Sequence, residues 1–432
     1  MKKITLLPTG SSGAGTGIGR SSGNGYTTTA TSTSFGKVSN ILSRSISRRQ
    51  LLRNGAFLAA GLPFAGNFLD KIQAGPIVPC PVIPLVHPAA GIVLGVNVTG
   101  VQDMSEAQQD ALIGQMQQNG VKTVRTGISE KFTRFIIRAY ERGIGSVVII
   151  YPTEASTGGQ VRPADKSVGL QWAQPPITAA DPVKFKAWLA SRIETLEAAG
   201  VHLTAFELGN EINGPFFNGD FLPAQASGRV LGIGDLNNPD DPEGRAIAAS
   251  YRAYLKIMAV LKELRDHSTL NQTTPIISAG LADGGLPGKK PGQRLDGVSI
   301  PATLAFLRQN GLDELVDGYG VHVYPSNDPH RWTVPGLIDD LNKDALALCT
   351  ASKPAWLTEW GFDNKDNSCP LDDSTRVKLI ETMRNALQHF AGQGRLAASI
   401  YYSWGSHPGE TGSTIFRCGD LTEAGKLALK PM

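Results

Sequence analysis

Two glutamates stand at the ends of apolar runs, where a buried strand would meet a loop. Glu211 closes 203-LTAFELGNE-211, and Glu359 closes 355-AWLTE-359. A carboxyl group at such a position adds nothing to a core. Two facing carboxyl groups can divide the work of a proton donor and an ionised nucleophile, if their environments push the two pKa values apart.

Five further residues with useful chemistry lie near the ends of other apolar runs. A guanidinium can hold a nearby carboxylate ionised. Amide, imidazole and phenol groups can bond a carboxylate or a sugar hydroxyl, and an indole offers a flat face for a pyranose ring. Taken singly, each has an ordinary structural explanation, and only their shared position indicates a site. They are Arg125, Asn210, His322, Tyr324 and Trp404.

Apolar strand-like runs alternate with helical patterns from residue 90 onward. Strands that are apolar on both faces and separated by helices indicate parallel βαβ units. Eight such units favour a closed (β/α)8 barrel, and no Gly-x-Gly-x-x-Gly turn follows the first run to favour an open dinucleotide-binding sheet. We expect strands at 91–98, 121–126, 145–151, 203–209, 275–281, 317–324, 355–360 and 398–404, and helices at 105–118, 129–142, 181–199, 243–266, 301–310, 335–350 and 373–393.

The expected loops after the third, fourth and fifth strands are long, at 152–178, 212–242 and 282–300. In a barrel of this class, long loops after strands mark the face that carries the active site. The ends of strands four and seven face each other across that mouth. Glu211 and Glu359 would then be the minimal equipment for hydrolysis of a glycosidic bond.

The chain from about 90 to 430 resembles the clan A glycoside hydrolases, the retaining (β/α)8 group that includes families 5 and 39. In that clan an Asn-Glu pair ends strand four and a second Glu ends strand seven. The resemblance implies Glu211 as acid/base and Glu359 as nucleophile. Ile212 stands where many members have proline. Because some motifs are closer to family 5 and others to family 39, the resemblance identifies the clan and no single family. The substrate-binding positions that it matches are Arg125, Asn210, His322, Tyr324 and Trp404.

The function implied is retaining hydrolysis of a β-linked poly- or oligosaccharide by double displacement, with no metal or organic cofactor. A transglycosylase would use the same residues with a sugar in place of water, so the sequence does not separate the two. A non-catalytic glycan-binding barrel would keep the aromatic residues and lose a carboxylate. A metal-dependent amidohydrolase would need a His-x-His motif near the first strand, and 95-GVNVTG-100 has none.

Bulk composition argues against two classes of partner other than carbohydrate. The chain has 432 residues and a net charge of +3 without a basic stripe, which argues against nucleic acid, and no apolar run in its body is long enough to span a membrane. We expect a monomer.

The first 75 residues differ from the rest. Residues 8–40 consist mostly of Gly, Ser, Thr and Asn, and 47-SRRQLLR-53 precedes a short apolar stretch. This pattern predicts a disordered leader with a twin-arginine export signal over 1–75, a catalytic domain over 80–432, and a periplasmic or secreted protein.

Export permits disulfides among the four cysteines. Cys369 falls in the loop after the seventh strand and Cys418 after the eighth, on one face of the barrel. Cys349 falls near the end of a helix, at the opposite face. We therefore expect a Cys369–Cys418 disulfide.

Overall fold

The computed structural model describes residues 91–155, 175–222, 229–282, 297–366, 368–405 and 412–432. The predicted leader, the twin-arginine motif, Cys80 and parts of the three long loops lie outside the described residues, and the division into 1–75 and 80–432 stays a prediction. No helix within the described ranges is long and apolar enough to cross a membrane.

Eight parallel strands form one sheet in the order β6-β4-β3-β2-β1-β10-β9-β8. Its two edges also meet, since Ile277 pairs with Gly318 and Leu281 with Val321 in parallel bridges. The sheet thus closes on itself, and the predicted (β/α)8 barrel is confirmed. The strands are β1 (Val93–Asn97), β2 (Thr123–Gly127), β3 (Gly145–Ile150), β4 (Ala205–Leu208), β6 (Ile276–Ile277), β8 (Tyr319–Val323), β9 (Ala355–Trp360) and β10 (Leu396–Tyr401).

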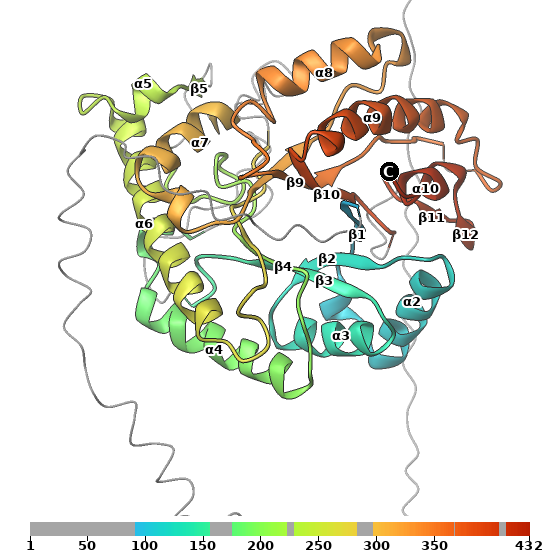
Figure 1. Cartoon of the computed structure of the whole chain (residues 1–432), viewed down its shortest axis with the longest axis horizontal. Helices are drawn as coiled ribbons and strands as arrows, with labels where there is room; N and C mark the ends of the chain where they lie inside the picture. Colours follow the sequence, from blue (N-terminus) through green and yellow to red (C-terminus); the bar gives the residue numbers. More distant parts are fainter. Residues whose placement is uncertain (1–90, 156–174, 223–228, 283–296, 367, 406–411) are drawn as a thin grey trace, which may run out of the picture. The chain divides into compact units, whose positions relative to one another are not determined.

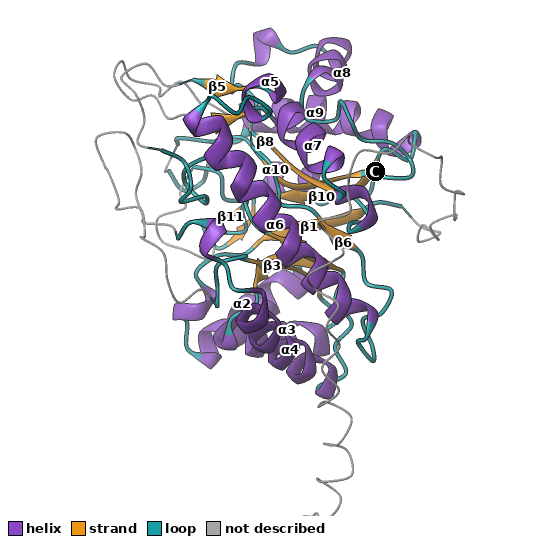
Figure 2. Ribbon diagram, turned by 90° about the vertical axis from the view of Figure 1, so that its left-hand side faces the viewer, coloured by secondary structure: helices purple, strands orange, loops and turns teal. Residues whose placement is uncertain are grey.

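Helices surround the strands, which run through the middle of the domain (Figures 1 and 2). The start of the helix predicted at 181–199 is confirmed: Asp181 accepts hydrogen bonds from the amides of Val183 and Lys184, and Pro182 opens the first turn. The helices are α2 (Glu106–Gln118), α3 (Glu130–Glu141), α4 (Pro182–Ala198), α5 (Ile233–Leu236), α6 (Pro242–Asp266), α7 (Ile300–Gln309), α8 (Val334–Lys343), α9 (Ser374–Gly392) and α10 (Glu423–Ala428).

Two predicted elements end early. Helix α8 stops at Lys343 and not at 350, because Asp344 leaves the helical conformation with φ −123° and ψ −88°. The apolar pattern continues past this point because Leu346, in a turn, and Cys349, just after it, remain buried. Strand β6 keeps two residues of the seven expected, and residues up to Leu281 reach their neighbours through isolated bridges.

The loops after β4 and β6 are joined by a feature that the sequence did not suggest. Strand β5 (Val230–Leu231) pairs in parallel with β7 (Gly297–Val298), and Asn213 donates to the carbonyls of Ala282 and Val298 at 2.6 and 2.8 Å. A second small pair, β11 (Phe416–Arg417) with β12 (Asp420–Leu421), follows β10. Strands of two residues are too short to leave a periodic pattern.

Candidate active site

The chain turns sharply where β4 ends, and this turn aims Glu211. Gly209 has φ +86° and Glu211 has φ +43°, in the left-handed region that residues with a side chain rarely adopt. The Glu211 amide donates to the carbonyl of Gly280 at 2.7 Å, which fixes the turn against the neighbouring strand. Unusual backbone of this kind is concentrated at functional sites.

Glu359 lies near the end of β9, a strand buried along its whole length. It is paired in register with His322 of β8. Its Oε1 accepts a hydrogen bond from Arg125 Nη1 at 2.6 Å, and its Oε2 accepts one from the hydroxyl of Tyr324. Arg125 of β2 and Tyr324 at the end of β8 therefore hold this carboxylate in one orientation.

The two predicted carboxylates come together with His322 between them. One donor atom from each of Glu211, His322 and Glu359 lies within 4.8 Å of the other two. The Nδ1 atom of His322 is 2.8 Å from Glu211 Oε1 and 3.7 Å from Glu359 Oε2. Retaining glycosidases hold their carboxyl groups about 5–5.5 Å apart and inverting ones about 6.5–9.5 Å. One oxygen of Glu211 and one of Glu359 thus lie closer together than the carboxyl groups of an inverting enzyme.

His322 fits at this point because Gly280 has no side chain. A Cβ on Gly280 would lie 2.0 Å from His322 Nε2, far inside any permitted contact. The imidazole is fully buried and packs over this glycine. Any larger residue at 280 would displace the ring from both carboxylates.

Arg125 is the centre of a buried polar network inside the barrel mouth. Its Nε and Nη2 donate to the two carboxylate oxygens of Glu207 at 2.5 and 3.1 Å. Its Nη1 also reaches Asn97 Oδ1 at 2.8 Å, and its Nη2 reaches Asn210 Oδ1 at 2.8 Å. The sequence analysis placed Arg125 and Asn210 here, but missed Glu207 and Asn97. The signal for Glu207 was a charged residue in the middle of an otherwise apolar strand, β4.

Electrostatics keep Glu359 ionised. Burial of the carboxyl group favours the neutral form, but His322 and Arg125, together with the hydrogen bond from Tyr324, hold the pKa of Glu359 below its ordinary value. Burial likewise opposes the charged form of Arg125, yet the carboxylates of Glu207 and Glu359 raise its pKa further. Burial of the hydroxyl and the adjacent Glu359 raise the pKa of Tyr324 well above its usual range.

Among the described residues, Glu211, His322 and Glu359 are the one group of three acidic, histidine or cysteine side chains close enough to hold a metal ion. Glu359 is already bound to the guanidinium of Arg125 at 2.6 Å. A divalent cation at this point would lie beside a fixed positive charge. The guanidinium of Arg125 therefore disfavours a metal ion between these three side chains.

The structure corrects the role expected for Trp404. Its ring is completely buried and stacks on Phe416, with ring centres 5.0 Å apart, so it presents no free face to a sugar. The aromatic surface beside the carboxylates comes instead from Tyr324, which is 45% exposed, and from the half-buried Tyr402 at 6.1 Å from it. The chain direction at the end of β10 decided which of the two nearby aromatic residues faces the mouth.

Cys369 and Cys418 form a disulfide between the loop after β9 and the turn of the β11–β12 pair. Cys349 is buried and takes part in no disulfide. The structure thus has the predicted Cys369–Cys418 disulfide, and Cys349 is a free thiol outside it.

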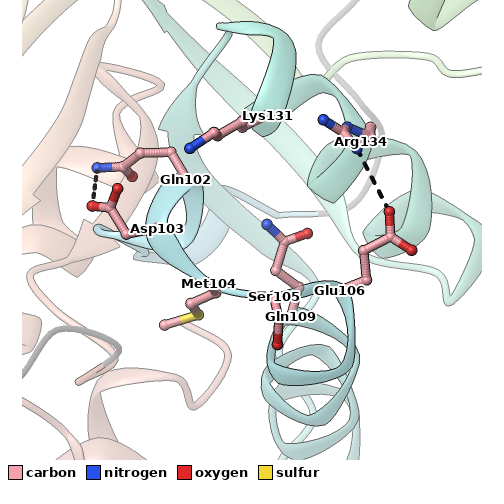
Figure 3. A pocket seen from close by; sticks show the side chains of 8 residues that line it. All are labelled: Gln102, Asp103, Met104, Ser105, Glu106, Gln109, Lys131 and Arg134. Atoms are coloured by element: carbon pink, nitrogen blue, oxygen red, sulfur yellow. Dashed lines mark hydrogen bonds and ion pairs between the residues drawn. The ribbon is translucent and has the colours of Figure 1, made fainter. Parts of the chain in front are cut away.

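A pocket of about 290 Å³ opens between the loop after β1 and the first turns of α2 and α3 (Figure 3). None of the predicted site residues lines it. Its charged and amide side chains pair with one another, as Gln102 does with Asp103 and Arg134 with Glu106. This pocket is a surface hollow separate from Glu211 and Glu359.

No protein-family model matches the sequence, and no curated protein matches it. Several solved structures are similar to the chain. A fungal β-1,4-galactanase structure shares 14% identity over 78% of this chain and 98% of that one, with a TM-score of 0.48. An endo-β-1,3-glucanase (GH128, subgroup II) from Sorangium cellulosum shares 14% over 79% and 98%, at 0.43. An endo-1,4-β-D-mannanase from Thermotoga petrophila shares 15% over 72% and 88%, at 0.40. Similarity this distant does not define an activity.

Proposed function

We propose that this protein is a retaining glycoside hydrolase that cleaves a β-linked poly- or oligosaccharide. The observation that carries the proposal is the distance between Glu211 and Glu359, whose donor atoms lie within 4.8 Å of each other and of His322. That spacing suits direct attack by a carboxylate and leaves too little room for the water of an inverting reaction.

In the first step Glu359 attacks the anomeric carbon while Glu211 gives its proton to the leaving oxygen. The glycosidic bond breaks, and the sugar is held on Glu359 as an ester. In the second step Glu211 takes a proton from water, whose oxygen attacks the anomeric carbon and releases Glu359. The lowered pKa of Glu359 supports its role as the ionised partner.

The neighbours of the two carboxylates have separate tasks in this scheme. Arg125 and Tyr324 keep Glu359 ionised and oriented. His322 contacts Glu211 at 2.8 Å and links the two groups. Asn210 is held by Arg125, and Tyr402 beside Tyr324 offers an aromatic surface to the sugar. The similar solved structures carry names of β-glycan hydrolases, but the proposal rests on the site.

The decisive variants replace each carboxylate in turn. Glu359→Gln is expected to lower kcat by about 10⁴-fold or more on the natural substrate, because the nucleophile is lost. Glu211→Ala is expected to lower it by about 10²–10⁴-fold, the usual share of general acid–base catalysis. Azide should partly restore only the Glu211 variant on a substrate with a good leaving group. A panel of β-glucans, xylans, mannans and galactans identifies the substrate, and NMR of the first product shows its anomeric configuration.

Near-normal turnover by Glu359→Gln, or a first product of inverted configuration, would refute the assignment. Labelling by a 2-deoxy-2-fluoro glycoside provides an independent check, since the trapped peptide must contain Glu359.

A further inference from the structure

Glu207 is a completely buried carboxylate that takes no part in the proposed bond-breaking steps. Four groups donate hydrogen bonds to it. Arg125 does so through two nitrogens, Thr358 through its hydroxyl at 2.9 Å, and Gly280 through its amide at 3.1 Å. A carboxylate bound by both nitrogens of one edge of a guanidinium fixes the plane of that guanidinium.

Arg125 therefore carries one positive charge between two carboxylates. Glu207 lies on one side of it at 2.5 Å and Glu359 on another at 2.6 Å. Three strands and the residues just after them supply four other titratable groups around the site, and α6 supplies a fifth. They are His322 of β8, Tyr324 just after β8, Glu211 after β4, Tyr151 just after β3, and Tyr254 of α6, whose environment includes Glu207.

We propose that Glu207 is a positioning residue that orients Arg125 and takes up part of its charge, and so sets how tightly Arg125 holds the nucleophile Glu359. The inference rests on the proposed function, because it needs Glu359 as the nucleophile. An arginine without Glu207 would bind Glu359 more strongly and make it a weaker base. An enzyme without the arginine would leave Glu359 buried and prone to protonation.

The test compares the pH dependence of kcat/KM for the wild type, Glu207→Gln and Glu207→Asp. Its acid limb reports ionisation of Glu359 in the free enzyme. Removing the charge of Glu207 leaves Arg125 bound by Glu359, Asn97 and Asn210. We expect Glu207→Gln to move the acid limb about one pH unit lower, and kcat to fall by about ten-fold, since one pKa unit is a ten-fold change in basicity. Glu207→Asp keeps the charge and should stay near the wild type.

A matched control separates this effect from simple loss of a buried ion pair. Asp373 is bound through both oxygens by Arg376, and both side chains are buried. We expect Asp373→Asn to lower Tm as Glu207→Gln does, while its acid limb stays at the wild-type pH. An acid limb of Glu207→Gln that stays in place or moves upward overturns the proposal.

Two measurements keep the test decisive if Glu207→Gln does not fold or no substrate is found. Thr358→Val removes one donor from Glu207, so that Glu207 draws Arg125 more strongly and the pKa of Glu359 should rise slightly. Carbon-13 NMR titration of labelled glutamate carboxylates, assigned with Glu359→Gln, measures that pKa without turnover. No shift in either experiment refutes the role of Glu207. Full activity of Glu359→Gln would instead refute the proposed function.

Discussion

Arg125 and Arg376 are the most deeply buried arginines in the described part of the chain, and each binds a carboxylate through two nitrogens. Arg376 of α9 pairs with Asp373 at 2.7 and 3.1 Å, and its remaining donors reach the carbonyl of Thr414 and the hydroxyl of Thr422. Arg125 pairs with Glu207 in the same manner, but its remaining donors reach a second carboxylate. The first cluster is balanced and joins chain segments. The second has more carboxylate than cation and lies at the mouth of the barrel.

The difference between the two clusters distinguishes an ion pair that stabilises the fold from one that can serve a reaction. A buried charge is tolerated where its partner and its hydrogen bonds are complete, as at Arg376. At Arg125 the same pairing leaves a second carboxylate, Glu359, that is ionised and still reachable, with 11% of its side chain exposed. We infer that the unbalanced cluster serves catalysis and the balanced one closes the C-terminal segment onto the barrel.

Replacing each of the two arginines should have the largest effect and should show the difference between the two clusters most clearly. Arg125→Met leaves two buried carboxylates without their cation, so we expect a loss of about 3–5 kcal/mol in the free energy of unfolding. We also expect kcat/KM to fall by about 10²-fold, because the pKa of Glu359 rises. Arg376→Met should cost similar stability and leave kcat/KM near the wild-type value. Chemical denaturation and steady-state kinetics at constant pH measure both quantities.

The pH dependence of this loss has a definite sign. The pKa of Glu359 is lowered in the folded protein, so its contribution to stability is present above the ordinary glutamate value of about 4.3 and is lost as the pH falls through the folded value. The stability difference between the wild type and Arg125→Met should therefore shrink below about pH 5. A difference that grows on acidification would show that Arg125 does not stabilise an ionised carboxylate.

The disulfide offers a second test of the difference between the two arginine clusters, because it lies beside the cluster of Arg376 and Asp373. Cys369 precedes Asp373 by four residues and Cys418 follows Thr414 by four. The bond joins two positions that are 49 apart in the chain, and loop entropy predicts about 4 kcal/mol for it before any strain. We expect Cys369→Ser with Cys418→Ser to lower Tm and to leave the acid limb of kcat/KM unchanged.

Cys349→Ala is the matched control, since this thiol is buried outside any disulfide. Its Tm should keep the sensitivity to reductant that the double variant loses. Peptide mapping of the non-reduced protein tests the pairing itself. Alkylation of Cys369 without prior reduction would contradict it.

The sequence predicted the barrel and the two carboxylates because both leave local signals. Each of the eight barrel strands is an apolar run, and Glu211 and Glu359 interrupt the apolar pattern at its end. Glu207 could not be assigned in the same way, because its role depends on a guanidinium 82 positions away in the chain. The split between Tyr402 and Trp404 was also beyond the sequence, since both follow the same strand and only the chain path selects the exposed one.

Tyr402 and Trp404 give the prediction with the smallest expected effect. They are two residues apart, yet Tyr402 lies beside the Arg125 cluster at the barrel mouth and Trp404 packs into the C-terminal segment. Tyr402 lies 6.1 Å from Tyr324 and is half-buried, whereas Trp404 packs on Phe416 of β11 with no exposed surface. Tyr402→Ala removes the aromatic surface that we propose contacts the sugar. We expect KM to rise by about ten-fold with little change in Tm, since such a contact contributes about 1 kcal/mol or somewhat more. Trp404→Phe keeps an aromatic ring but leaves a cavity beside Phe416, so Tm should fall while KM stays near the wild-type value. Substrate titration and thermal unfolding of the two variants measure these effects. If Trp404→Phe raises KM as much as Tyr402→Ala does, the indole reaches the substrate after all, and the line drawn between the two regions is wrong.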